Sequence, residues 1–133
     1  MKIQGACHCG DISYEAVIDP ARVSICHCSD CQALTGSAFR VTASTLIENF
    51  VLRSGAPKIY VKTGDSGAKR AQAFCPRCGS PLYAYAVDNP KTYGLRVGCI
   101  AQRHELAPTL QIWCGSALSW TTDIGDIATR QGE

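Results

Sequence analysis

Nine cysteines in a chain of 133 residues constrain this fold more than any other feature of the sequence. Most of them fall into three groups: Cys7-His8-Cys9-Gly10, Cys26-His27-Cys28-Ser29-Asp30-Cys31 and Cys75-Pro76-Arg77-Cys78-Gly79. Cys99 and Cys114 stand alone. The first residues contain no apolar core of signal-peptide length, and no run approaches the ~18 apolar residues of a membrane span. We therefore expect a cytoplasmic location, where clustered thiols indicate metal binding or catalysis before disulfides.

The third group carries the sharpest metal-binding signal. Two thiolates separated by two residues bind one tetrahedral zinc ion at about 2.3 Å per sulfur when a tight turn brings both sulfurs to one side. Pro76 fixes one φ of such a turn, and Gly79 supplies a position where φ can be positive. A redox pair of the thioredoxin kind would need a βαβ setting, which this sequence does not show. Cys75 and Cys78 are therefore predicted to bind zinc.

A structural zinc site needs four ligands, so Cys75 and Cys78 require a complement from elsewhere in the chain. Cys7 and Cys9 are the natural candidates, because Cys9 is also followed by a glycine. A metal bound by both pairs would close a long loop, which is where a cross-link gains most in principle. Spacing alone leaves open a complement from the middle group.

The middle group offers three thiolates, Cys26, Cys28 and Cys31. Structural zinc sites are closed by four protein ligands, whereas catalytic sites have three and keep one position for water or substrate. A zinc ion with three thiolates carries a net charge of −1, which suits it to binding a further sulfur. Two alternatives would close this site: His27 could turn inward, or one of the two isolated cysteines could complete it from a distance.

Short runs in which apolar and polar residues alternate recur along the rest of the chain, at 12–16, 59–61, 95–99 and 110–112. Each run ends in Gly, Pro, Asn, Asp or Ser, so we expect an all-β sandwich or barrel-like domain. One short helix is predicted over 29–34, with Ser29 as its N-cap. Cys99 is expected to be buried on the core face of its strand, and Trp113 and Trp120 are expected to pack against the core or its rim.

Composition agrees with a folded chain and excludes some functions. Hydrophobic residues make up 46% of the sequence and charged residues 18%, which is typical of one globular domain spanning 1–133. The net charge is only +2, and the Lys and Arg residues between 58 and 77 are spread out with an aspartate among them. Nucleic-acid binding, which favours a clustered basic face, is therefore not indicated.

In order along the chain, these motifs resemble the glutathione-dependent formaldehyde-activating enzyme family, which includes the centromere protein V group. The resemblance rests on C-x-C-G at 7–10, C-H-C-x-x-C at 26–31, Thr35-Gly36-Ser37-Ala38-Phe39, and Phe74-Cys75-x-x-Cys78-Gly-Ser-Pro-Leu82. Leu110-Gln111-Ile112-Trp113, followed by Ser116 and Trp120, is similar to the family's closing strand. The similarity runs from about Gly5 to Trp120.

The resemblance implies a mainly β, Mss4-like fold of small antiparallel sheets around zinc with one short helix. It implies two zinc ions per chain, one structural and one catalytic. The structural ligands would be Cys7, Cys9, Cys75 and Cys78. The catalytic ligands would be Cys26, Cys28 and Cys31. The activity implied is that of a carbon–sulfur lyase acting on a thiol/aldehyde adduct like S-hydroxymethylglutathione, with small-molecule thiol and aldehyde partners and neither nucleic acid nor membrane.

A non-enzymatic, zinc-stabilised binding module is the alternative, because a fold does not fix a function. A small-molecule-sized cleft beside the three-cysteine group would favour the enzyme, and a sealed group would favour the binding module. A redox sensor that uses the same three cysteines would instead form a reversible disulfide.

Overall fold

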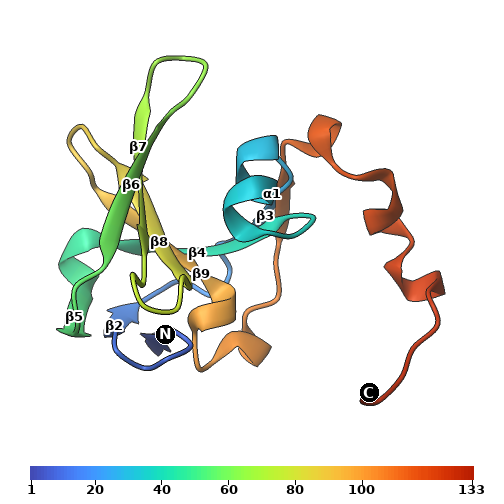
Figure 1. Cartoon of the computed structure of the whole chain (residues 1–133), viewed down its shortest axis with the longest axis horizontal. Coiled ribbons are helices and arrows are strands. Elements are labelled where there is room, and N and C mark those ends of the chain that lie inside the picture. The colour runs from blue at the N-terminus through green and yellow to red at the C-terminus, as the bar shows by residue number, and fades with distance from the viewer.

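The computed structural model describes all residues 1–133 and contains ten strands, one α-helix and six short 3₁₀ turns (Figure 1). The strands form a three-stranded sheet, in order β1-β2-β5, and a seven-stranded sheet, in order β10-β3-β4-β9-β8-β7-β6. Their bounds are β1 Lys2–Ala6, β2 Ser13–Val17, β3 Val23–Cys26, β4 Arg40–Leu46, β5 Phe50–Ser54, β6 Lys58–Thr63, β7 Lys69–Phe74, β8 Pro81–Ala86, β9 Thr92–Arg96 and β10 Leu110–Ile112. All pairs are antiparallel except β10 with β3. The expected mainly β fold with one short helix is confirmed.

The hydrophobic core is built from one face of each sheet. Alternation in β1 and β2 buries Ile3 and Tyr14 almost completely. In the large sheet, Ala43 pairs with Leu95 and Leu95 pairs with Tyr83, so the three side chains form one row. The rings of Tyr14 and Tyr83 meet edge to face at 6.5 Å and join the two sheets.

The opposite face of the large sheet is polar. Cys26 on β3 lies directly opposite Arg40 on β4, and Thr42 on β4 lies opposite Arg96 on β9. Because opposed residues on neighbouring strands point to the same face, these side chains share one surface. Gln72 on β7 belongs to it too, since the Arg96 guanidinium donates a 3.0 Å hydrogen bond to its Oε1. This polar surface carries the second group of cysteines.

Helix α1 (Ser29–Thr35) packs against β4; it begins at Ser29, as predicted, and ends one residue later than predicted. The predicted N-cap, Ser29, is wrong: Cys28 is the cap, with extended backbone, and its thiol accepts a hydrogen bond from the amide of Cys31. The cysteine sulfur accepts the hydrogen bond that a serine hydroxyl usually accepts at this position. The helix ends at Thr35 and is capped by Gly36, whose φ of 65° is left-handed.

Two further expectations need correction. Strand β9 ends at Arg96, and Val97–Cys99 forms a 3₁₀ turn, so Cys99 is half-buried and its thiol donates to the carbonyl of Pro81 at 3.3 Å. The alternation at 110–112 does not produce a buried face, because β10 is an exposed edge strand.

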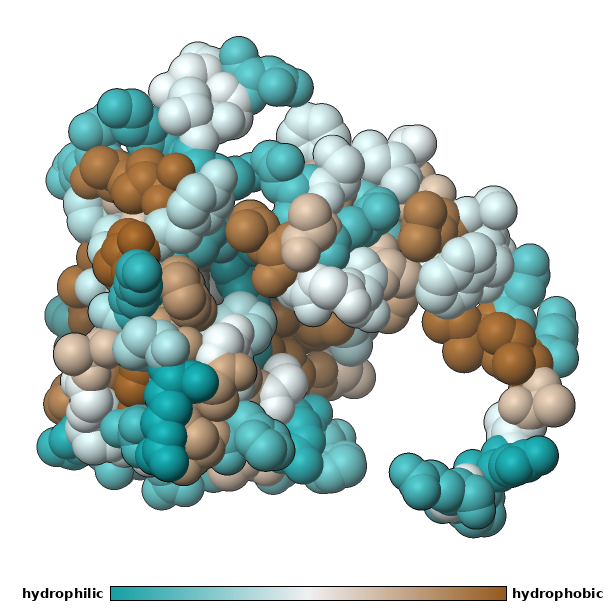
Figure 2. All heavy atoms as spheres, in the orientation of Figure 1, coloured by the Kyte–Doolittle hydropathy of each residue, from teal (hydrophilic) through white to brown (hydrophobic).

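The chain beyond β10 leaves the sheets and ends in three 3₁₀ turns (Figure 1). Apolar side chains gather along this projecting segment in Figure 2. Trp113 and Trp120, expected to pack against the core or its rim, are 67% and 51% exposed. None of the helices is long and apolar enough to cross a membrane.

The packing of Gly5 in β1 generates a stability prediction. A Cβ at Gly5 would lie 2.0 Å from Cζ of the buried Tyr14 ring, whereas a Cβ at Gly98 would meet nothing within 4 Å. We expect Gly5→Ala to lower the free energy of unfolding by about 1–3 kcal/mol, because the core has no room to absorb a methyl group. Urea unfolding measures this, with Gly98→Ala as control. Equal stability of the two variants would contradict the packing described.

Candidate metal centres

The first and third cysteine groups meet in space. The sulfurs of Cys7, Cys9, Cys75 and Cys78 all lie within 4.8 Å of one another. Cys9 Sγ is 3.6 Å from Cys7 Sγ and 3.7 Å from Cys75 Sγ. These separations are far too long for disulfides. They match the spacing of about 3.8 Å between sulfurs that bind one tetrahedral ion with 2.3 Å bonds.

Tight turns and backbone hydrogen bonds orient the four sulfurs of the first cluster towards one another. The amide of Gly79 donates to the carbonyl of Cys75 at 2.8 Å, and Gly79 has a φ of 76°, as the predicted turn requires. The amide of Ile12 donates to Cys7 Sγ at 3.3 Å. Hydrogen bonds from Ser80 lower the pKa of Cys78 to about 5. Such donors stabilise thiolates, the form that binds metal.

The middle group forms a second, separate cluster. The sulfurs of Cys26, Cys28 and Cys31 lie within 4.8 Å of one another, and no fourth histidine, cysteine or carboxylate joins them. Cys26 ends β3, Cys28 caps α1 and Cys31 lies in the first helical turn. Cys26 and Cys31 are buried, whereas Cys28 is partly exposed. The cluster therefore offers three protein ligands.

The alternatives that would close the second cluster are not realised in this structure. His27 is buried, its Nε2 lies 2.7 Å from Oε1 of Gln111 on β10, and its ring packs edge to face on Phe39. His27 thus fixes the cysteine loop against β10, as does the 3.1 Å hydrogen bond from its amide to the carbonyl of Ile112. The two isolated cysteines lie outside both clusters.

Two cationic side chains, Arg40 and Lys62, act on the thiols of the second cluster. Burial and then contacts with Cys28 and Cys26 raise the pKa of Cys31 to about 12, and the charge of Arg40 opposes this rise. Burial also acts to raise the pKa of Cys28, but hydrogen bonds from Cys31 outweigh it and the pKa falls, with help from the charge of Lys62. Positive charge close to three thiols favours their ionised, metal-binding form.

A hollow of about 360 Å³ lies next to this cluster, lined by residues adjacent to the cysteines and not by the cysteines themselves. Its lining includes Ala33 and Leu34, which follow Cys31 on α1, and Arg40, which lies opposite Cys26. Gln72 and Arg96 form its floor on the polar face of the large sheet. Volumes of about 300 Å³ and above accommodate small ligands. Sequence reasoning missed these three polar residues because they come from three strands and share no motif.

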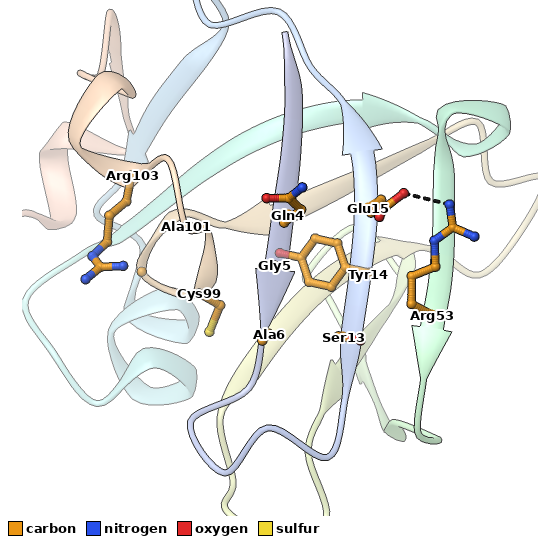
Figure 3. Close-up of a pocket in the computed structure, with 11 residues that line it drawn as sticks. Gln4, Gly5, Ala6, Ser13, Tyr14, Glu15, Arg53, Cys99, Ala101 and Arg103 are labelled. Atoms are coloured by element: carbon orange, nitrogen blue, oxygen red, sulfur yellow. Dashed lines mark hydrogen bonds and ion pairs between the residues drawn. The ribbon is translucent and has the colours of Figure 1, made fainter.

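A larger hollow, of about 510 Å³, lies on the three-stranded sheet (Figure 3). Figure 3 shows Glu15 and Arg53 at its edge joined by an ion pair, with an N–O distance of 2.6 Å, and Tyr14 pointing inward from β2. Its lining contains none of the residues that flank the second cluster. Its one carboxylate is already paired with a guanidinium, so it offers less chemistry than the hollow beside α1.

Comparisons with known proteins agree with this geometry. The family model described as glutathione-dependent formaldehyde-activating enzyme matches residues 2–116. An uncharacterised lyase of Schizosaccharomyces pombe (strain 972 / ATCC 24843) is 31% identical over 88 residues, and this match covers 66% of the present chain and 60% of that protein. A crystal structure of a Rhodobacter sphaeroides protein superposes with a TM-score of 0.64 at 25% identity, covering 81% of this chain and 98% of that one. The chain belongs to the glutathione-dependent formaldehyde-activating enzyme family.

Proposed function

We propose that this protein is a zinc-dependent enzyme of the carbon–sulfur lyase type that acts on an adduct between a thiol and an aldehyde. The observation that carries the proposal is the second cluster, which has three cysteine ligands, no fourth protein ligand and a hollow beside it. A closed structural site would need a fourth ligand, and a binding module would have no use for an open one.

The donor sets of both clusters fit zinc. Four thiolates are a common structural set, and the sulfur separations at the first cluster match a tetrahedral ion. At the second cluster Cys26, Cys28 and Cys31 would hold the ion. A zinc ion there would supply a soft Lewis acid able to take a thiolate as its fourth ligand.

The chain's own residues would prepare the site for this chemistry. Hydrogen bonding to Cys28 from the Cys31 amide fixes the first helical turn, and His27 fixes the loop before it. Arg40 and Lys62 place positive charge close to an anionic cluster, which would stabilise a substrate in its thiolate form. In the synthetic direction the thiol sulfur forms a bond to the aldehyde carbon, and the thiol proton ends on the former carbonyl oxygen.

The comparisons support this class of reaction. The matched family takes its description from formaldehyde activation with glutathione, and the S. pombe relative is named a lyase. Because the match spans 60% of that relative, its activity comes to this chain only as part of the proposal.

The role of the second cluster can be tested with cobalt, whose metal–sulfur absorption reports a new sulfur ligand. Adding 2-mercaptoethanol to the cobalt-substituted wild type should shift this absorption. Cys31→Ala should lose about one metal equivalent and the shift, because two ligands are too few to hold the ion. Cys114→Ala, which removes an exposed cysteine outside both clusters, is the control. A shift that persists in Cys31→Ala would place thiol binding elsewhere.

The two clusters should also differ in how tightly they hold metal. With three protein ligands, the second should release its ion to a chelator before the first, which has four. Titration with EDTA, followed by metal analysis and far-ultraviolet circular dichroism, should remove one equivalent while the strand signal stays intact. Loss of both metals in a single step with unfolding would contradict two distinct sites.

The first cluster should stabilise the fold. Cys78 is its exposed member, so Cys78→Ser removes a ligand without opening a cavity in the core. Structural zinc contributes on the order of 10 kcal/mol in small zinc domains, and we expect the variant to be insoluble or to lose its near-ultraviolet circular dichroism. Cys114→Ser is the matched control. A Cys78→Ser protein that melts like the wild type while lacking one metal would refute a stabilising role.

A further inference from the structure

The polar face of the large sheet brings two arginines to the hollow beside the second cluster. Arg40 lies opposite Cys26 in the β3–β4 pair. Arg96 lies opposite Thr42, which is two residues beyond Arg40 on β4 and on the same face. Both guanidinium groups reach Gln72 on β7, whose Oε1 accepts hydrogen bonds of 3.3 Å from Arg40 and 3.0 Å from Arg96. Three strands thus place two positive charges and one amide at a single point.

Neither arginine has a carboxylate partner. The ion pairs of the protein join Arg53 to Glu15, Lys62 to Asp30 and Arg77 to Asp11, and the lining of the hollow contains no acidic residue. Yet Arg96 is only 6% exposed, and its remaining hydrogen bonds go to neutral oxygens of Thr42 and Gly94. A charge removed from water without a counter-charge is costly.

Two donors at this point also lack acceptors. Arg40 Nε and Gln72 Nε2 are buried and have no hydrogen-bond partner. Buried donors without partners are rare in folded proteins and need an explanation, such as a ligand that accepts from them. Both unpartnered groups here are donors and both nearby charges are positive, and this combination favours an anionic ligand.

We propose that Arg40, Gln72 and Arg96 form a subsite for a carboxylate carried by the thiol substrate. This inference rests on the proposed function and names the class of its substrate: a thiol acid whose sulfur reaches the second cluster and whose carboxylate lies in the hollow. A planar carboxylate matches the fork of a guanidinium and can accept from the Gln72 amide at the same time. Gln72 pairs with Ala84, and Ala84 pairs with Gly94. These two small residues therefore leave space above the sheet next to Gln72.

A competing explanation is that the arginines only balance the charge of the thiolate cluster. The charge of Arg40 acts to lower the pKa of Cys31, and the charge of Cys31 acts to raise the pKa of Arg96. That role would strengthen the binding of every thiol equally, whether or not it carries a carboxylate. A carboxylate subsite would instead discriminate between thiols of the same length.

The experiment compares 3-mercaptopropionate with 3-mercapto-1-propanol, which differ only in the carboxylate. Their dissociation constants are measured from the shift in the metal–sulfur absorption of the cobalt-substituted protein. The wild type should bind the acid about 10- to 100-fold more tightly, the range expected for a hydrogen-bonded charge pair that is partly shielded from water. Arg40→Gln should remove most of this preference: both thiols lose the thiolate stabilisation that Arg40 gives them in common, and only the acid loses the additional contact to its carboxylate.

Two further variants sharpen the comparison. Gln72→Glu is nearly isosteric and supplies an internal carboxylate between the two arginines, so it should also abolish the preference while the fold is kept. Arg70→Gln removes one charge from an exposed position two residues from Gln72 and outside the hollow, and it should keep the preference. If Arg70→Gln reduced the preference as much as Arg40→Gln, a general charge effect would replace the subsite.

Side-chain resonances give a readout that does not depend on a thiol. Titrating propionate into the zinc-loaded wild type should shift the Gln72 side-chain amide signals in a nitrogen–proton NMR spectrum, and 1-propanol should not. Equal affinity for both thiols, together with no response to propionate, would overturn the subsite while leaving the proposed function standing. A metal–sulfur absorption that responds to neither thiol would count against the proposed function instead, and the propionate titration would still decide on the subsite.

Discussion

Four cysteine sulfurs meet where the loop between β1 and β2 lies against the turn between β7 and β8, so a metal bound there would link the three-stranded sheet to the seven-stranded sheet. Around the sulfurs, the amide of His8 donates to Ser80 Oγ at 3.0 Å, and Arg77 pairs with Asp11 at 3.0 Å. These surface contacts are individually weak, because exposed ion pairs contribute little. A metal bound by all four thiolates would be the stronger link between the two sheets.

The large sheet separates stability from chemistry by its two faces. One face sends Ala43, Tyr83 and Leu95 into the core, and the opposite face carries Thr42 and Arg96. Because strand side chains alternate strictly, neither face can change register without destroying the other. The second cluster and the proposed carboxylate subsite thus have rigid support from residues that also pack the core.

The sequence predicted what depends on local spacing and missed what depends on register. Local spacing identified the pairs Cys7/Cys9 and Cys75/Cys78 and the triplet of the second cluster, whereas the joining of the two pairs was implied by the family resemblance and is seen in the structure. Arg40, Gln72 and Arg96 could not be found this way, because they meet only through the pairing of β4 with β9 and through hydrogen bonds from both arginines to Gln72 on β7. The exposure of Trp113 was missed because an aromatic residue usually packs, and only the path of the chain after β10 shows that this one does not.

The central claim, that one cluster is closed and the other open to a thiol, can be tested most directly by X-ray absorption at the zinc edge. For fully loaded protein the account predicts about 3.5 sulfur ligands per zinc at about 2.3 Å, because seven cysteine sulfurs would be shared between two ions. Adding 3-mercaptopropionate should raise this average to about four, as its sulfur takes the remaining position. Four sulfurs per zinc before any thiol is added, or an average that the thiol leaves unchanged, would contradict the account.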